Sequence, residues 1–268
     1  MQSKTKLKTQ SKIRSKIRLL FVLALLIPAS ASARVFNFDD QTFSTYLRGT
    51  YGTSNLQRNG YGPGFPSSVN YPDSSPVSQG YSAEFGFAFT SPKFCNVRIG
   101  VELLNPAGTT AATGTNAAGT ALFKMTEQVY SVIPQGNVEI FLKKFQGSRL
   151  YLGLGGGYAV TTIQNSYTMT ATGTSTFNLG NYIEEGTGWG VMGQGYLGYE
   201  FSAFDSVSMS FDVGYRTLTV SNFTSNRNFT APYGQINTGN PIINYTGGNR
   251  YVDLGGYFAG LNFRFYFH

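Results

Sequence analysis

The chain has 268 residues, of which 41% are hydrophobic and 12% are charged, and it is rich in glycine, phenylalanine and tyrosine. The formal net charge of +7 comes from seven basic residues within the first 33 positions, so the remainder is formally neutral and nucleic acid is not an expected partner. A single cysteine, Cys95, excludes an internal disulfide and a metal cluster built on thiolates.

Residues 1–33 have the three parts of a secretory signal peptide. The basic residues precede an apolar run over residues 19–27, and Pro28 is followed by the small residues Ala31 and Ala33. This run is far shorter than the roughly 20 residues that a retained transmembrane helix needs. We therefore expect cleavage after Ala33, which leaves residues 34–268 as one domain.

The rest of the chain contains eight segments in which apolar and polar side chains alternate with a period of two. This pattern is typical of β-strands that present a different environment to each face. In the last segment, Leu261, Phe263 and Phe265 share one face, and Arg264 and Tyr266 share the other. In chain order the segments cover residues 43–51, 81–90, 97–103, 124–142, 150–160, 189–201, 207–216 and 255–268.

The connections between these segments alternate in length. Short connections are predicted at residues 91–96, 143–149 and 202–206, and long polar loops at residues 53–79, 105–121, 164–185 and 220–250. An even number of strands with both termini on one side places the short turns in the periplasm and the long loops outside the cell. Weak alternation in residues 167–177 and 223–243 leaves projecting hairpins or a ten-stranded barrel open.

The composition of the polar faces distinguishes a soluble β-sandwich from a membrane-spanning β-barrel. A soluble sandwich would turn its polar faces to water and carry many Lys, Glu and Asp residues there. The polar faces here hold mainly Gly, Ser and Tyr with a few isolated charges. We therefore predict an all-β fold, an eight-stranded antiparallel up-and-down transmembrane β-barrel.

Two motifs and the leader carry a resemblance to a known family. The motifs are Tyr-Leu-Gly-Leu-Gly-Gly-Gly-Tyr at residues 151–158 and Gly-Leu-Asn-Phe-Arg-Phe at residues 260–265. Residues 43–268 resemble the small bacterial outer-membrane β-barrels, which include OmpA-like, OmpX-like and OmpW-like eight-stranded proteins. One departure is His268, which follows the last phenylalanine where the family usually ends on an aromatic residue.

The resemblance implies a location and partners. It implies a monomer in the cell outer membrane, in contact with outer-membrane lipids and lipopolysaccharide. It also implies that the barrel-assembly machinery recognises the last strand during biogenesis. The residues expected to form that signal are Gly260, Phe263, Phe265 and Phe267.

Several charged residues fall on the faces predicted to point inward. The lumen of an eight-stranded barrel is barely wide enough for side chains, so these charges should pair with one another. Such pairing predicts a closed interior, and a narrow ion path through the same charges is the alternative. The expected network contains Arg48, Glu84, Arg98, Glu102, Glu139, Glu200, Asp212, Arg216 and Arg264.

The sequence offers little to catalysis. Its only histidine, His268, follows the last strand at the periplasmic end, which argues against the histidine-dependent chemistry of barrel enzymes. A carboxylate-only site at Glu184, Glu185 and Asp253 remains conceivable, although adjacent loop acids are typically solvated. The glycines of residues 153–157 lie inside an alternating segment with no helix after them, so they predict no nucleotide cofactor.

We therefore expect no catalytic residue, metal or cofactor. The predicted function is a non-enzymatic structural or surface-display barrel whose loops contact an extracellular ligand or a cell surface. The alternative is a narrow channel for small solutes, as in OmpW-like barrels.

Overall fold

The computed structural model describes residue 38 and residues 41–56, 64–71, 77–91, 93–106 and 110–267. The predicted signal peptide, with Ala31 and Ala33, and the terminal His268 lie outside the described residues. In the described part of the chain, no helix is both long and apolar enough to cross a membrane.

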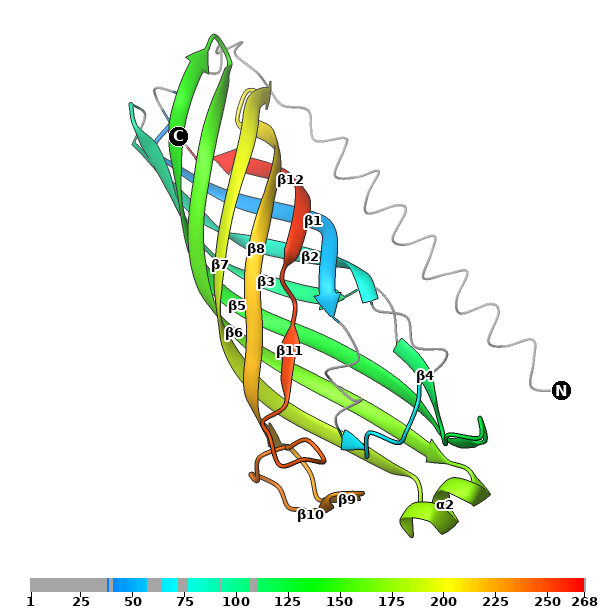
Figure 1. Ribbon diagram of the computed structural model, residues 1–268. Coiled ribbons are helices and arrows are strands. Elements are labelled where there is room, and N and C mark those ends of the chain that lie inside the picture. Colours follow the sequence, from blue (N-terminus) through cyan, green and yellow to red (C-terminus); the bar gives the residue numbers. More distant parts are fainter. Residues whose placement is uncertain are drawn as a thin grey trace, which may run out of the picture. The chain divides into compact units, whose positions relative to one another are not determined.

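One antiparallel sheet dominates the fold, and eight of its strands close into a ring (Figure 1). The ring strands are β1 (Phe43–Leu56), β2 (Val77–Ser91), β3 (Cys95–Pro106), β5 (Ala121–Phe145), β6 (Ser148–Met169), β7 (Tyr182–Phe204), β8 (Val207–Ser225) and β12 (Gly256–Tyr266). The first and last strands close the ring, with Arg48 of β1 opposite Asn262 of β12. Two further strands, β4 (Thr110–Thr115) and β11 (Tyr251–Asp253), pair with β5 and β8 without widening the ring. The predicted eight-stranded up-and-down barrel is confirmed.

The outer wall of the barrel is apolar and the inner wall is buried, as the alternation predicts. Phe85 and Ile99 have 57% and 56% of their surface exposed, whereas Glu84 and Arg98, which directly precede them in the same strands, are fully buried. Aromatic pairs such as Tyr158 and Trp189, with ring centroids 6.0 Å apart, contribute to the outer surface. An apolar exterior around a polar interior is the arrangement of a barrel that spans a lipid bilayer.

The strands differ in length around the ring. β5, β6, β7 and β8 contain 25, 22, 23 and 19 residues, whereas β1, β2, β3 and β12 contain 14, 15, 12 and 11. A strand needs about 9 to 11 residues to cross a bilayer, so β5 to β8 extend well beyond it. They reach the lower end of the barrel in Figure 1, next to α2 (Ala171–Phe177) and the hairpin of β9 (Phe229–Ala231) and β10 (Gly234–Ile236).

Three of the four predicted long loops contain regular structure. Residues 164–185 are largely strand, with Asn165 of β6 opposite Glu184 of β7, and only α2 and short turns connect them. Residues 105–121 contain β4, and residues 220–250 contain the end of β8 and the β9–β10 hairpin. The hairpin agrees with the weak alternation seen there. Threonine-rich segments favour extended backbone once a neighbouring strand pairs with them, although the same composition is common in loops.

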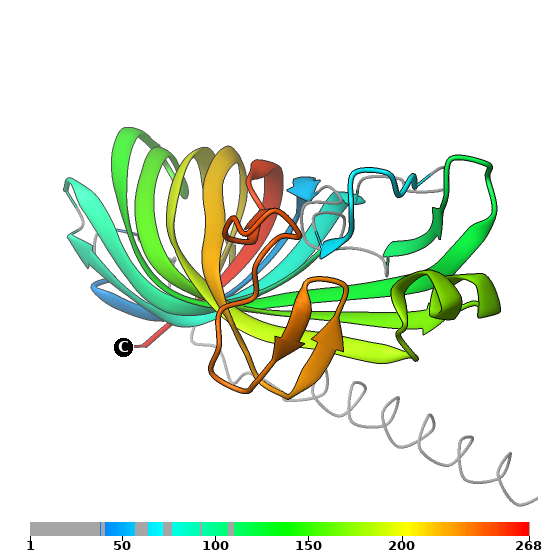
Figure 2. The same cartoon turned by 60° about the horizontal axis from the view of Figure 1, so that its bottom comes forward.

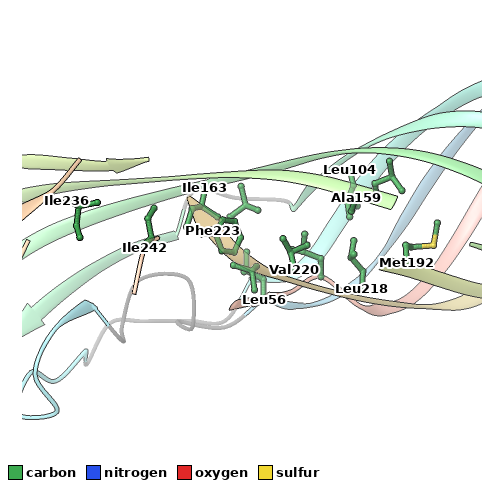
Figure 3. Packing of buried hydrophobic residues seen from close by; sticks show 14 of the residues in the cluster. Leu56, Leu104, Ala159, Ile163, Met192, Leu218, Val220, Phe223, Ile236 and Ile242 are labelled. Atoms are coloured by element: carbon green, nitrogen blue, oxygen red, sulfur yellow. The ribbon is translucent and has the colours of Figure 1, made fainter. Parts of the chain in front are cut away.

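Two apolar clusters lie toward the end of the barrel where β5 to β8 extend, and they include residues of the elements packed there. Figure 3 shows the larger one, in which Leu104 of β3, Ile163 of β6 and Phe223 of β8 pack with residues such as Ile236 and Ile242. The second cluster lies beside α2 and includes Phe65 and Phe123, whose stacked rings have centroids 4.1 Å apart. Turning the molecule shows the hairpin, β4 and α2 gathered toward the same end (Figure 2).

Candidate functional site: the interior of the barrel

The structure places all nine predicted interior charges on the inner wall, and none is more than 4% exposed. Their positions follow from the alternation: each lies on the opposite face from the lipid-facing residues of its own strand. Charges removed from water in this way must be paired, because an isolated buried ion is very costly.

Eight charged side chains form one unbroken series in which acids and arginines alternate. Each contact is an ion pair of 2.5 to 3.2 Å between side chains that are at most 1% exposed. Three acids, Glu84, Glu139 and Glu200, each lie between two arginines. In order, the series runs Asp212, Arg48, Glu84, Arg98, Glu139, Arg264, Glu200 and Arg149.

Arg149 is a member of this series that the sequence analysis missed. It begins the inward face of β6, where its Nε donates to Glu200 at 2.7 Å and its Nη2 donates to the Tyr266 hydroxyl at 3.0 Å. The alternating pattern could have identified Arg149. Arg149 and Tyr151 lie on one face of the strand, and the apolar Leu150 and Leu152 lie on the other. With Arg149 included, the series together with the Arg216 and Glu102 pair contains five arginines and five acids, instead of the four and five predicted.

Aromatic side chains contact both the acids and the arginines of this series. The hydroxyls of Tyr46, Tyr196 and Tyr266 donate to Glu84, Glu139 and Glu200 respectively, at 2.5, 3.2 and 2.8 Å. The rings also cover guanidinium groups: the Arg98 Cζ atom lies 4.7 Å from the Tyr46 ring centroid and 5.6 Å from that of Tyr196. Such cation–π contacts add to the ion pairs, while the Nε atoms of Arg98 and Arg264 and the Nη1 atom of Arg149 have no acceptor among the described residues.

Two glycines make room for the tyrosines. A Cβ atom at Gly153 would collide with the Tyr196 ring, and one at Gly198 would collide with the Tyr151 ring. The glycine-rich motif of residues 151–158 therefore serves packing of large rings inside a narrow barrel.

One ion pair lies apart from the series. Arg216 pairs with Glu102 at 2.5 Å, and the other oxygen of Glu102 accepts from Gln135 Nε2 at 3.1 Å. Gln194 then donates to the side-chain oxygens of Gln135 and Asn137 at 2.8 and 2.7 Å. These side-chain contacts and the larger apolar cluster involve the same strands, because β3, β5, β7 and β8 contribute residues to both.

A second buried ion pair lies beyond the membrane-spanning part of the barrel. Arg250 donates to Glu184 at 2.8 Å, and Glu184 also accepts from Asn165 at 3.0 Å and from the Tyr233 hydroxyl at 2.9 Å. Burial and the Glu184 charge raise the pKa of Tyr233, so its hydroxyl stays a donor. The expectation that Glu184 is a solvated loop acid is wrong, because Glu184 lies on the inward face of a strand and is 1% exposed.

The residues of the predicted assembly signal lie on both faces of β12 and, in the case of Phe267, directly after it. Phe265 and Phe267 face outward with 44% and 57% of their surface exposed, and Phe263 is partly exposed on the same face. Gly260 faces inward, where a Cβ atom would lie 2.5 Å from an oxygen of Asp212. This glycine is thus needed for the Arg48 and Asp212 pair, and recognition by an assembly machinery stays a prediction.

The closed ring, the lipid-facing wall and the ion-paired interior define the class of protein: an outer-membrane β-barrel of eight strands. No protein-family model and no curated protein matches the chain.

Several solved structures of barrels are similar to the chain, and three of them follow. One is the outer membrane protein OprG from Pseudomonas aeruginosa, at 11% identity and a TM-score of 0.40, over 86% of this chain and 99% of OprG. Another is Neisserial surface protein A, at 11% identity and a TM-score of 0.30, over 82% of this chain and 95% of that protein. The third is the outer membrane protease OmpT from Escherichia coli, at 9% identity and a TM-score of 0.31, over 88% of this chain and all of OmpT.

Proposed function

We propose that the protein is a non-enzymatic outer-membrane barrel that does not conduct solutes and that presents a folded surface outside the cell. The observation that carries this proposal is the alternating series of eight charged side chains across the lumen. Each of its inner members pairs on both sides, so water and ions have few free charged groups to follow.

The larger apolar cluster also supports a closed lumen, at a different height along the barrel from the charged series. Its inward-facing residues come from the barrel strands and from the β9–β10 hairpin, with Val220 fully buried and Phe223 and Ile242 each 1% exposed. A path for ions would have to cross both the paired charges and this apolar layer.

The parts of the chain beyond the bilayer support a role in display. β5 to β8 carry α2 and the hairpin outward, and the Tyr233 hydroxyl, from the turn of the hairpin, donates to Glu184 of the buried Arg250 and Glu184 pair. Exposed residues such as Thr172 and Asn240 give this end a polar surface with few charges, which suits contact with a ligand or another cell.

Conductance tests the proposal. Refolded protein in a planar bilayer should show no steady stepwise current, and Asp205→Asn, which changes an exposed turn acid, should behave in the same way. Steady channels whose conductance or ion selectivity changes in Arg98→Met or Glu102→Gln would contradict the proposal and would favour a narrow solute channel.

A further inference from the structure

A cleft of about 380 Å³, partly open to solvent, lies at the end of the molecule where α2 and the β9–β10 hairpin are found. Two connections form its walls, one running from α2 into β7 and the other from β8 into β9 (Figure 1). Residues 179–183 come from the first and residues 227–230 from the second. Pockets for small organic ligands typically measure about 300 to 1,000 Å³, so this cleft has room for such a ligand.

The base of the cleft is formed by packed aromatic rings. Tyr182 of β7 and Phe229 of β9 both line it, and their stacked rings have centroids 6.1 Å apart. Tyr182 also stacks with Tyr167 of β6 at 4.6 Å, and Phe229 is only 7% exposed. These contacts hold the two walls together without a ligand. A preformed cleft loses little conformational freedom when a ligand binds.

The amide groups in the cleft present donors to a ligand. The side-chain oxygen of Asn181 accepts from the Met169 N–H at 2.8 Å, and that of Asn228 accepts from the Thr238 N–H at 2.7 Å. Each oxygen is therefore occupied by a backbone donor, whereas neither amide nitrogen has an acceptor among the described residues. The two amide nitrogens suit the hydroxyl oxygens of a ligand.

Arg227 adds one positive charge to the same cleft. The other arginines of the described chain each pair with at least one carboxylate, whereas exposed Arg227 has no ion pair among the described residues. Glu185 lies close to this segment, but its carboxylate accepts from Asn226 Nδ2, at 3.5 Å. An unpaired guanidinium can bind a carboxylate through two parallel hydrogen bonds.

We propose that this cleft binds an acidic saccharide. Its carboxylate accepts hydrogen bonds from Arg227, and its hydroxyl groups accept from the amide nitrogens of Asn181 and Asn228. A single guanidinium beside uncharged amides matches a sugar acid better than a polyanion or an apolar molecule. The inference rests on the proposed function only in placing this end outside the cell, where it names the class of ligand that is met there.

Digalacturonate is a suitable probe, and galabiose is its neutral control, because both are α-1,4-linked disaccharides and galabiose lacks the carboxylates. Binding to the refolded protein in uncharged detergent is measured by ligand-observed NMR titration against empty micelles. Saturable binding of digalacturonate is expected, with binding of galabiose weaker by at least fivefold. Higher salt should weaken the binding of digalacturonate, since the ion pair is exposed.

Two variants test the site itself. Arg227→Gln should weaken digalacturonate binding by at least fivefold, while Lys93→Gln, which removes an exposed charge in the turn between β2 and β3, should leave it unchanged. Gly180→Phe should abolish the binding of both sugars by filling the cleft. A Cβ atom at Gly180 would meet no atom within 4 Å, so this variant should fold, which heat-dependent gel mobility checks.

A comparison of vesicles identifies the source of the saccharide. Loss of digalacturonate binding in vesicles that contain lipopolysaccharide, but not in vesicles of phospholipid alone, would assign the cleft to the acidic sugars of that lipid. Binding in both would assign it to a glycan from outside the membrane.

The proposal is overturned if digalacturonate does not saturate the native protein, if galabiose binds equally well, or if either cleft variant binds like the native protein. None of these results bears on conductance, so the closed barrel and the saccharide site stand or fall separately.

Discussion

Glu139 shows how the interior balances the cost of burying charge. It is fully buried, and its two oxygens accept from Arg98 and Arg264 at 2.9 and 2.5 Å, with a further bond from Asn96 at 2.9 Å. Burial alone disfavours a carboxylate, and two guanidinium groups together with an amide offset that cost. The stability of the barrel should therefore depend on such residues far more than on exposed charges.

Glu139→Gln leaves two buried arginines with one carboxylate each. Breaking a buried ion pair in this way typically costs about 3 to 5 kcal/mol, so we expect the unfolding midpoint to shift to clearly lower denaturant concentration. Trp189, the only tryptophan of the chain, lies on the outer wall and reports unfolding by fluorescence. Asp205→Asn, at an exposed turn, is the matched control and should change stability by no more than about 0.5 kcal/mol. Equal shifts for the two variants would show that the series does not stabilise the fold.

The charged series was largely predictable from the sequence because the alternation fixes which side chains point inward. The inward orientation of Arg48, Arg98 and Glu139 is predicted because apolar residues occupy the alternate positions of the same strands. The order of pairing was not predictable. It depends on which strands face one another across the lumen, as with Arg264 of β12 and Glu139 of β5, which are 125 positions apart.

At the level of elements, the sequence predicted the membrane-spanning strands better than their extensions. Within the bilayer, one face of each strand must be apolar, and this produces the period of two. Beyond the bilayer both faces meet water or protein, so β6 and β7 continue through Asn165, Thr187 and similar residues without a lipid-facing stripe. The extensions are held by cross-strand pairing and by the apolar clusters, which no local pattern reveals.

The hairpin of β9 and β10 depends on the buried pair of Arg250 and Glu184. Glu184→Gln removes the charge that Arg250 and Tyr233 share, and a hydrogen bond to a charged group is worth about 1.5 to 3 kcal/mol. We expect the segment around exposed Arg227 to open more often, so trypsin should cleave there at least tenfold faster while the barrel stays intact.

Glu185→Gln is the matched control for this experiment, because Glu185 is the adjacent acid and is only partly buried. Cleavage rates are followed on gels with folded protein in detergent. If Glu184→Gln is cleaved no faster than Glu185→Gln, the buried pair does not hold the hairpin in place.

Across the whole molecule, the interior is divided into a charged level and an apolar level. The charged level lies where all eight strands form the wall, with both β1 and β12 contributing to it through Arg48 and Arg264. The apolar level lies toward the end where β5 to β8 continue and the hairpin packs inward. This division fits a barrel inserted in one direction, with the short turns on the inner side of the membrane and α2 outside.

Cysteine labelling tests that direction. In a Cys95→Ala background, Thr172→Cys places one thiol on α2 and Gln146→Cys places one in the turn between β5 and β6, and both positions are exposed. A bulky maleimide that cannot cross the outer membrane should label the α2 thiol in intact cells and the turn thiol only after the membrane is permeabilised. The two sites serve as controls for each other, because purified protein should react at both. Labelling of the turn thiol in intact cells, with α2 protected, would mean that the barrel is inserted in the opposite direction, and the surface proposed for display would then face the periplasm.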